Sequence, residues 1–105
     1  MSSDAMPIHP LRVAKEINDV MTDGEIVIGD GGDVVTISAS AIHPRQPGHW
    51  MAPGPLSTLG VGAPFAIAAK VAKPGMEVVV LFGDGAVGCT GFDVTPRTSS
   101  GCRRP

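Results

Sequence analysis

The spacing of apolar residues along the chain predicts three helices. Residues Pro10–Met21 place apolar side chains three and four positions apart with charged residues between them, and Pro10 suits a first helical turn. Ala63–Ala72 is alanine-rich and apolar on nearly every side, which is typical of a helix packed between a sheet and other structure. Val34–Ile42 is also predicted to be helical with Asp33 as its N-cap, although its β-branched residues weaken the helix.

Two short apolar runs predict buried β-strands. Glu25–Gly29 and Glu77–Phe82 are rich in β-branched residues and are bounded by turn residues, as the strands of a parallel sheet are. The segment between them is long enough for the crossover that parallel strands need. His43–Pro55 is rich in proline, shows no period and is expected to be a loop. This order of helices and strands indicates an α/β fold.

Each predicted strand ends in an acidic glycine turn. The first runs into Asp30-Gly31-Gly32-Asp33 and the second into Gly83-Asp84-Gly85. Because open parallel sheets bind ligands at the carboxyl ends of their strands, the two turns predict a site at one edge of the sheet. Asp30 and Asp33 are candidates for an acidic metal site, but a turn aspartate followed by a helix cap is the favoured interpretation.

The second turn offers a carboxylate and backbone N–H groups to a ligand. Gly83–Gly88 also matches the dinucleotide fingerprint Gly-x-Gly-x-x-Gly, but Asp84 would repel a diphosphate unless a cation lay between them. Mg²⁺ binds carboxylate and phosphate oxygens together, and the N–H groups of residues 85–87 would then meet phosphate oxygens. A structural turn, a metal–diphosphate site and a dinucleotide site all stay open at this point.

The composition narrows the class of protein without identifying its chemistry. With 105 residues, 43% of them hydrophobic, the chain can form one small globular domain. Its net charge of −2 gives no reason to expect nucleic acid or an anionic membrane as partner. The longest apolar stretch, Val61–Ala72, is too short to span a bilayer, and Cys89 and Cys102 are expected to be reduced thiols. We therefore expect a soluble, cytoplasmic protein.

Other candidate groups carry weaker signals. The loop residues His43 and His49 are expected to be solvated, with a substrate or cofactor role for His49 as the alternative. His9 simply precedes a proline. Cys89 follows the second turn, but no His or Asn lies near it in the sequence, so we do not expect a catalytic thiol.

Two longer runs resemble the C-terminal cofactor-binding domain of thiamine-diphosphate enzymes. They are WMAPGPLSTLGVGAPFAIAAK at Trp50–Lys70 and PGMEVVVLFGDG at Pro74–Gly85. Asp30–Asp33 is also similar to the acetolactate-synthase-like and 2-hydroxyacyl-CoA-lyase-like members of that family. The resemblance covers His9 to Asp93, and several motifs in the same order make it far more specific than Gly-Asp-Gly alone.

The resemblance implies a fold, a cofactor and a set of contacts. Residues 1–93 would form a partial three-layer α/β domain, with a parallel sheet and flanking helices, that binds thiamine diphosphate and Mg²⁺. Asp84 would be the Mg²⁺ ligand, the carbonyl of Ser57 would accept a hydrogen bond from the aminopyrimidine, and Leu59 would hold the cofactor bent. Ordinary core packing is the alternative for Leu59. The implied cofactor-binding residues are Ser57, Leu59, Gly83, Asp84, Gly85, Ala86 and Val87.

Departures from the family limit the function expected of this chain. After Gly85 no Asn-rich turn completes the metal shell, and no segment resembles the N-terminal domain that supplies the family's activating glutamate. Residues 94–105 have no apolar period and are expected to be an irregular tail produced by truncation or a shifted reading frame.

The parent enzyme implied by the resemblance is a transferase or lyase that makes or breaks a carbon–carbon bond in 2-oxo or 2-hydroxyacyl substrates. It would act as a homo-oligomer with further domains or subunits. We assign no catalytic residue here and expect this chain alone to be inactive. A non-catalytic fragment without cofactor binding and a dinucleotide-binding module are the alternatives.

Overall fold

The computed structural model describes residues 6–94. Its elements, in chain order, are α1 (Pro10–Val20), β1 (Ile26–Asp30), α2 (Gly32–Ala41), β2 (Trp50–Met51), α3 (Gly62–Ala72), β3 (Val78–Phe82), α4 (Asp84–Thr90) and a 3₁₀ turn (Gly91–Val94). The predicted irregular tail lies outside the described residues, except for Val94 in the final turn.

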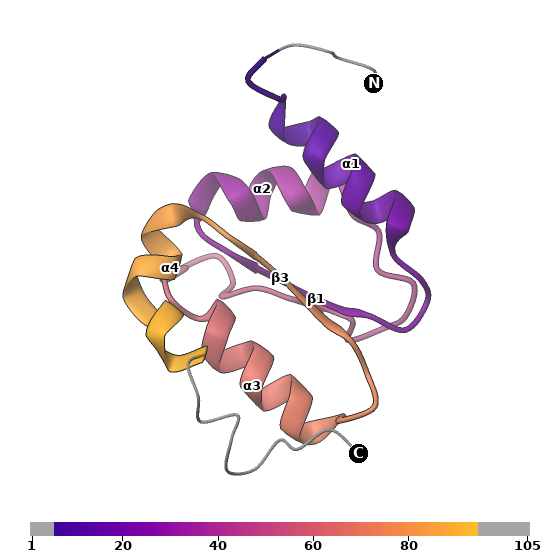
Figure 1. The fold of residues 1–105 in the computed structure, drawn as a ribbon, viewed down its shortest axis with the longest axis vertical. Helices are drawn as coiled ribbons and strands as arrows, with labels where there is room; N and C mark the ends of the chain where they lie inside the picture. The colour runs from indigo at the N-terminus through magenta and orange to yellow at the C-terminus, as the bar shows by residue number, and fades with distance from the viewer. Residues whose placement is uncertain (1–5, 95–105) are drawn as a thin grey trace.

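The strands form one parallel sheet in the order β2-β1-β3. Helices α1 and α2 cover one face of this sheet and α3 covers the other, with α4 at the end where β3 finishes (Figure 1). The expected three-layer α/β fold is therefore confirmed. No helix within residues 6–94 is long and apolar enough to cross a membrane.

The central strand β1 is buried on both faces, which explains its unbroken apolar run. Val27 packs with Ala14 of α1 and with Ile42, while Ile26 and Ile28 pack with α3 on the opposite face. This alternation follows the two-residue period of a strand. The core is thus two small apolar clusters that share β1.

The structure contains one strand that the sequence did not predict. Trp50 and Met51, inside the expected loop, pair with Val27 and Ile28. A strand of two residues is too short to show the alternation on which sequence patterns rest. The crossover between β1 and β3 is therefore interrupted by β2, and α3 follows it.

The start of α2 also differs from the prediction. The N-cap is Gly31, with φ of 117°, and the helix begins at Gly32, so Asp33 is not the cap. A Cβ built on Gly31 would lie 3.4 Å from the backbone nitrogen of Gly83. The positive φ and this close approach explain why glycine caps the helix. Asp33 instead lies in the first turn, where a carboxylate is favourable.

Candidate functional site

The two acidic glycine turns meet at one edge of the sheet, as predicted. Asp30 and Phe82 are paired in the register of β1 and β3, so both strands end at the same level. The N–H of Gly83 donates a hydrogen bond to the carbonyl oxygen of Asp30 at 3.0 Å. The second turn is therefore fixed directly beside the end of β1.

The second turn presents an exposed carboxylate on a bare backbone. Asp84 is exposed, and within residues 6–94 its Oδ1 accepts only the N–H of the next residue, Gly85, at 2.9 Å. Gly83 has φ of −80° and Gly85 lies within α4, so neither needs the conformational freedom of glycine. What the two glycines contribute is the missing side chain, which leaves the surface of the turn open to a ligand.

The backbone donors of this turn are less available than predicted. The N–H of Val87 donates to the carbonyl of Gly83 at 3.1 Å, because α4 has already begun there. The N–H of Gly85 faces the Asp84 carboxylate. Among the described residues, the N–H of Ala86 has no hydrogen-bond partner. The expectation of three free donors is therefore wrong for Gly85 and Val87, and the N–H without a partner belongs to Ala86, a residue that is only 1% exposed.

The first turn uses its carboxylate within the fold. Asp30 is completely buried; its Oδ1 accepts the N–H of Gly60 at 3.1 Å and its Oδ2 accepts the N–H of Gly62 at 2.7 Å. Asp33 is exposed, and within residues 6–94 no three acidic, histidine or cysteine side chains form a group that could hold a metal. The structure gives the alternative of an Asp30–Asp33 metal site no support, and Asp30 is a structural aspartate.

The Ser57–Leu59 segment lies beside the second turn. Leu59 is 51% exposed, and its Cδ1 is 3.8 Å from a Cβ built on Gly85. Ser57 is exposed, with a positive φ of 46°. Such exposure contradicts the alternative of core packing for Leu59. The loop and the turn, which lie far apart in the sequence, therefore share one surface.

His43 is exposed, as expected, but the other two histidines differ from their predictions. His49 is 3% exposed rather than solvated, and its Nδ1 is buried with no hydrogen-bond partner in the described part of the chain. It precedes β2, whose Trp50 pairs with Val27, so it lies toward the amino ends of the strands, away from Asp84. His9 has a role that the sequence did not indicate: its Nδ1 accepts the N–H of Leu11 and caps α1.

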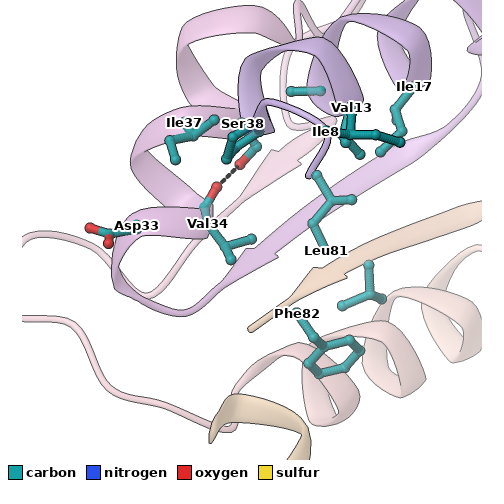
Figure 2. A pocket seen from close by; sticks show the side chains of 12 residues that line it. Ile8, Val13, Ile17, Asp33, Val34, Ile37, Ser38, Leu81 and Phe82 are labelled. Carbon is teal, nitrogen blue, oxygen red and sulfur yellow. Dashed lines mark hydrogen bonds between the residues drawn. The ribbon is translucent and has the colours of Figure 1, made fainter. Parts of the chain in front are cut away.

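A large apolar groove lies elsewhere, between α1, α2 and the outer side of β3 (Figure 2). Its volume is about 650 Å³, and its lining includes Ile8, Val13, Ile37 and Leu81. Among the described residues, its lining is apolar apart from Asp33 and Ser38, and no glycine turn forms part of it. The groove therefore lacks the chemistry that the turn at Asp84 provides.

The fold and its paired glycine turns define an α/β domain of the class that binds ligands at the carboxyl edge of a parallel sheet. The family model "Thiamine pyrophosphate enzyme, C-terminal TPP binding domain" matches residues 30–94, which is more than half of the chain. The chain belongs to this family. The match begins at Asp30 and includes both turns and the loop between them.

Curated relatives carry two kinds of name. The chain is 46% identical over 84 residues to 2-hydroxyacyl-CoA lyase 2 of Bos taurus, covering 80% of this chain and 13% of the bovine protein. It is 44% identical over 88 residues to the Homo sapiens protein of that name, covering 80% and 14%. A probable acetolactate synthase of Mycobacterium bovis is 39% identical over 90 residues, covering 86% and 16%. The chain thus spans only a small part of the length of these relatives.

Proposed function

We propose that this chain binds thiamine diphosphate through Mg²⁺ at the Gly83–Val87 turn. The observation that carries the proposal is the exposed Asp84 carboxylate between two glycines, on a turn whose Gly85 lies beside the side chain of Leu59. A carboxylate at that place needs a cation before a diphosphate can approach it. Family membership supports thiamine diphosphate as the compound that brings the diphosphate.

The residues present fit Mg²⁺ held by one protein carboxylate. Mg²⁺ in phosphate sites is commonly held by one or two carboxylates, phosphate oxygens and water, so a cluster of protein ligands is not required. Asp84 has an exposed side chain, and its Oδ2 has no partner among the described residues 6–94. The cation would neutralise the repulsion between Asp84 and the diphosphate.

The other site residues support parts of the cofactor by their position. Gly83 and Gly85 would let the diphosphate approach the backbone, and the N–H of the buried Ala86 would donate to a phosphate oxygen if ligand binding exposes it. Val87 would contribute its side chain, which is 45% exposed, rather than its N–H.

Beside the turn, Ser57 and Leu59 would contact the ring end of the cofactor. The Ser57 carbonyl would accept from the aminopyrimidine, and the exposed Leu59 side chain would support the bend of the cofactor. The cofactor itself supplies a carbon nucleophile and an electron sink when bound.

We further propose that the chain is part of an enzyme acting on 2-oxo or 2-hydroxyacyl compounds. The names of the relatives, 2-hydroxyacyl-CoA lyase 2 and acetolactate synthase, support this substrate class. The other domains or subunits of such an enzyme, as a homo-oligomer, would supply the substrate contacts. A cytoplasmic location stays a prediction, which fractionation of cells expressing the tagged chain would test.

Isothermal titration of the 105-residue chain with thiamine diphosphate and Mg²⁺ tests the binding proposal. We expect saturable heat that EDTA abolishes and that Asp84→Asn removes. Asp33→Asn is the matched control, because Asp33 is also an exposed carboxylate in a first helical turn at this edge. Absence of heat at millimolar cofactor would contradict the proposal and favour a fragment that binds nothing. Binding of a nicotinamide dinucleotide that survives EDTA would favour the dinucleotide alternative.

A further inference from the structure

The buried carboxylate of Asp30 has no cationic partner within residues 6–94. An ionised carboxylate without hydrogen bonds is strongly unfavourable in a protein interior. Both oxygens of Asp30 are instead satisfied by backbone N–H groups, those of Gly60 and Gly62. Hydrogen bonds to a charged acceptor are stronger than neutral ones, so these two contacts hold the chain firmly.

The contact also completes the start of α3 from another strand. The helix begins at Gly62, and the side chain of its N-cap residue, Val61, has no hydrogen-bond acceptor. Asp30 therefore takes the place of a capping side chain, and its negative charge lies at the positive end of the helix dipole. The start of α3 is fixed to the end of β1 by this single side chain.

Both donors belong to glycines because the backbone approaches its neighbours too closely for a side chain. A Cβ built on Gly62 would lie 2.6 Å from Cε1 of Phe82 and 3.0 Å from Oδ2 of Asp30. A Cβ built on Gly60, whose φ is 89°, would lie 2.8 Å from Cβ of Cys89. The Gly-x-Gly segment is therefore pressed between β3, α4 and the carboxylate.

Gly60 is held from its other side as well. The hydroxyl of Thr90, the last residue of α4, donates to the carbonyl of Gly60 at 2.8 Å. Asp30 thus fixes the N–H of Gly60 and Thr90 fixes its C=O. Leu59 is the residue immediately before Gly60, so these two bonds set where Leu59 lies relative to the turn of α4.

We propose that Asp30 is a positioning residue for the cofactor site. Its carboxylate sets the separation between the Ser57–Leu59 segment and the Asp84 turn. We call the hydrogen bonds that Asp30 and Thr90 make to the Gly60–Gly62 segment the clamp. The effect on cofactor affinity rests on the proposed function, whereas the clamp itself does not. Since the clamp acts on the loop and leaves the turn unchanged, it matters for a ligand that contacts both and not for one that contacts the turn alone.

This difference defines the test. Affinities of the 105-residue chain for thiamine diphosphate and for inorganic pyrophosphate, each with Mg²⁺, are measured for wild type, Asp30→Asn and the control Asp33→Asn. In Asp30→Asn an amide NH₂ would face a backbone N–H, which breaks one arm of the clamp. We expect thiamine diphosphate to bind at least about tenfold more weakly and pyrophosphate to change by less than about twofold. Equal weakening of both ligands, or no change in either, would overturn the proposal.

A second variant covers the case in which Asp30→Asn does not fold. Thr90→Val removes only the hydroxyl that holds the Gly60 carbonyl, and Thr36→Val is its control because Thr36 donates to a carbonyl on the exposed side of α2. We expect Thr90→Val to weaken the binding of thiamine diphosphate, by less than Asp30→Asn does, and to leave the binding of pyrophosphate unchanged. A Thr90→Val protein that binds both ligands like wild type would contradict the clamp.

Amide exchange separates failure of the clamp from failure of the proposed function. If the wild type binds neither ligand, the proposed function is wrong, and the clamp is judged by the exchange rates of the Gly60 and Gly62 amides. We expect both amides to be protected in the wild type and to exchange at least about tenfold faster in Asp30→Asn or, for Gly60, in Thr90→Val. Unchanged rates would overturn the inference.

Discussion

Asp30 and Asp84 follow neighbouring parallel strands and lie a short distance apart at one edge of the sheet, yet their carboxylates are used in opposite ways. Asp30 is buried and both its oxygens accept backbone N–H groups. Asp84 is exposed and, among the residues that the structure describes, accepts only the N–H of the following residue. Two acidic glycine turns with similar sequences thus have different roles. The carboxylate of Asp30 stabilises the fold, and that of Asp84 is available to a ligand.

The largest expected difference is in the free energy of unfolding, when the carboxylates of Asp30 and Asp84 are removed one at a time. Asp30→Ala leaves two buried N–H groups without a partner and should reduce the free energy of unfolding by about 2–4 kcal/mol. Asp84→Ala removes an exposed side chain and should change it by less than about 0.5 kcal/mol. Urea denaturation of both variants measures the difference. Equal losses of stability would show that the two carboxylates do not differ as described.

A second effect should separate the glycines that accompany each aspartate. Gly62→Ala places a methyl group 2.6 Å from Phe82 Cε1 and 2.9 Å from Val80 Cγ1, and should destabilise the chain by about 1–3 kcal/mol. Gly85→Ala has room, with Leu59 Cδ1 at 3.8 Å, and should stabilise α4 by up to about 1 kcal/mol.

For thiamine diphosphate affinity, the order of the two glycine variants should be reversed. Gly85→Ala puts a methyl group on the surface proposed to contact the diphosphate, so thiamine diphosphate affinity should fall about tenfold, which corresponds to about 1.4 kcal/mol. Melting temperatures and titration calorimetry measure stability and affinity separately. A Gly85→Ala protein that is less stable but binds normally would reverse the assignment of this turn.

The smallest effect concerns a third carboxylate, Glu25, which precedes β1 at the opposite end of the sheet. Its Oε1 accepts the backbone N–H of Thr22 at 3.0 Å and the Thr22 hydroxyl at 2.8 Å, and these bonds lower the pKa of Glu25 from its ordinary value of 4.5. A lowered pKa means that the folded state favours the ionised form. The stabilisation is therefore complete above about pH 4.5 and is lost as the pH falls through the lowered pKa.

Glu25→Gln should accordingly reduce the loss of stability between neutral and acidic pH. The urea midpoint of wild type should fall more steeply below pH 4.5 than that of the variant. Thr22→Val, which keeps the backbone donor and loses the hydroxyl, should give an intermediate slope. Identical slopes for wild type and Glu25→Gln would show that this carboxylate does not contribute.

Much of the framework could be predicted because its signals are local. The apolar periods of α1, α3, β1 and β3 gave their positions to within one or two residues. The meeting of the two turns followed from parallel pairing alone. By contrast, β2 has only two residues, and the positive φ of Gly31 depends on its approach to Gly83. Both features depend on contacts that no local pattern records.

The role of Asp30 escaped prediction for a similar reason. Its two partners lie 30 and 32 positions later in the chain, and a buried aspartate and an exposed one have the same neighbours in sequence. The pair Gly60 and Gly62, just before an alanine-rich helix, was the available signal, since such glycines often mark a close backbone approach. No pattern in the sequence indicated that His49 would be buried.

The parallel register of the sheet has a consequence for how this site comes into being. Ile26 pairs with Val78, and Asp30 pairs with Phe82, so every contact between β1 and β3 joins opposite halves of the chain. The part of the chain that the structure describes contains no local hairpin to form early, and closing so long a loop precedes any gain from pairing. We therefore expect the edge that brings Gly85 beside Leu59 to form only when the sheet does. During synthesis or refolding, the ability to bind a ligand should arise in one step, together with the sheet itself.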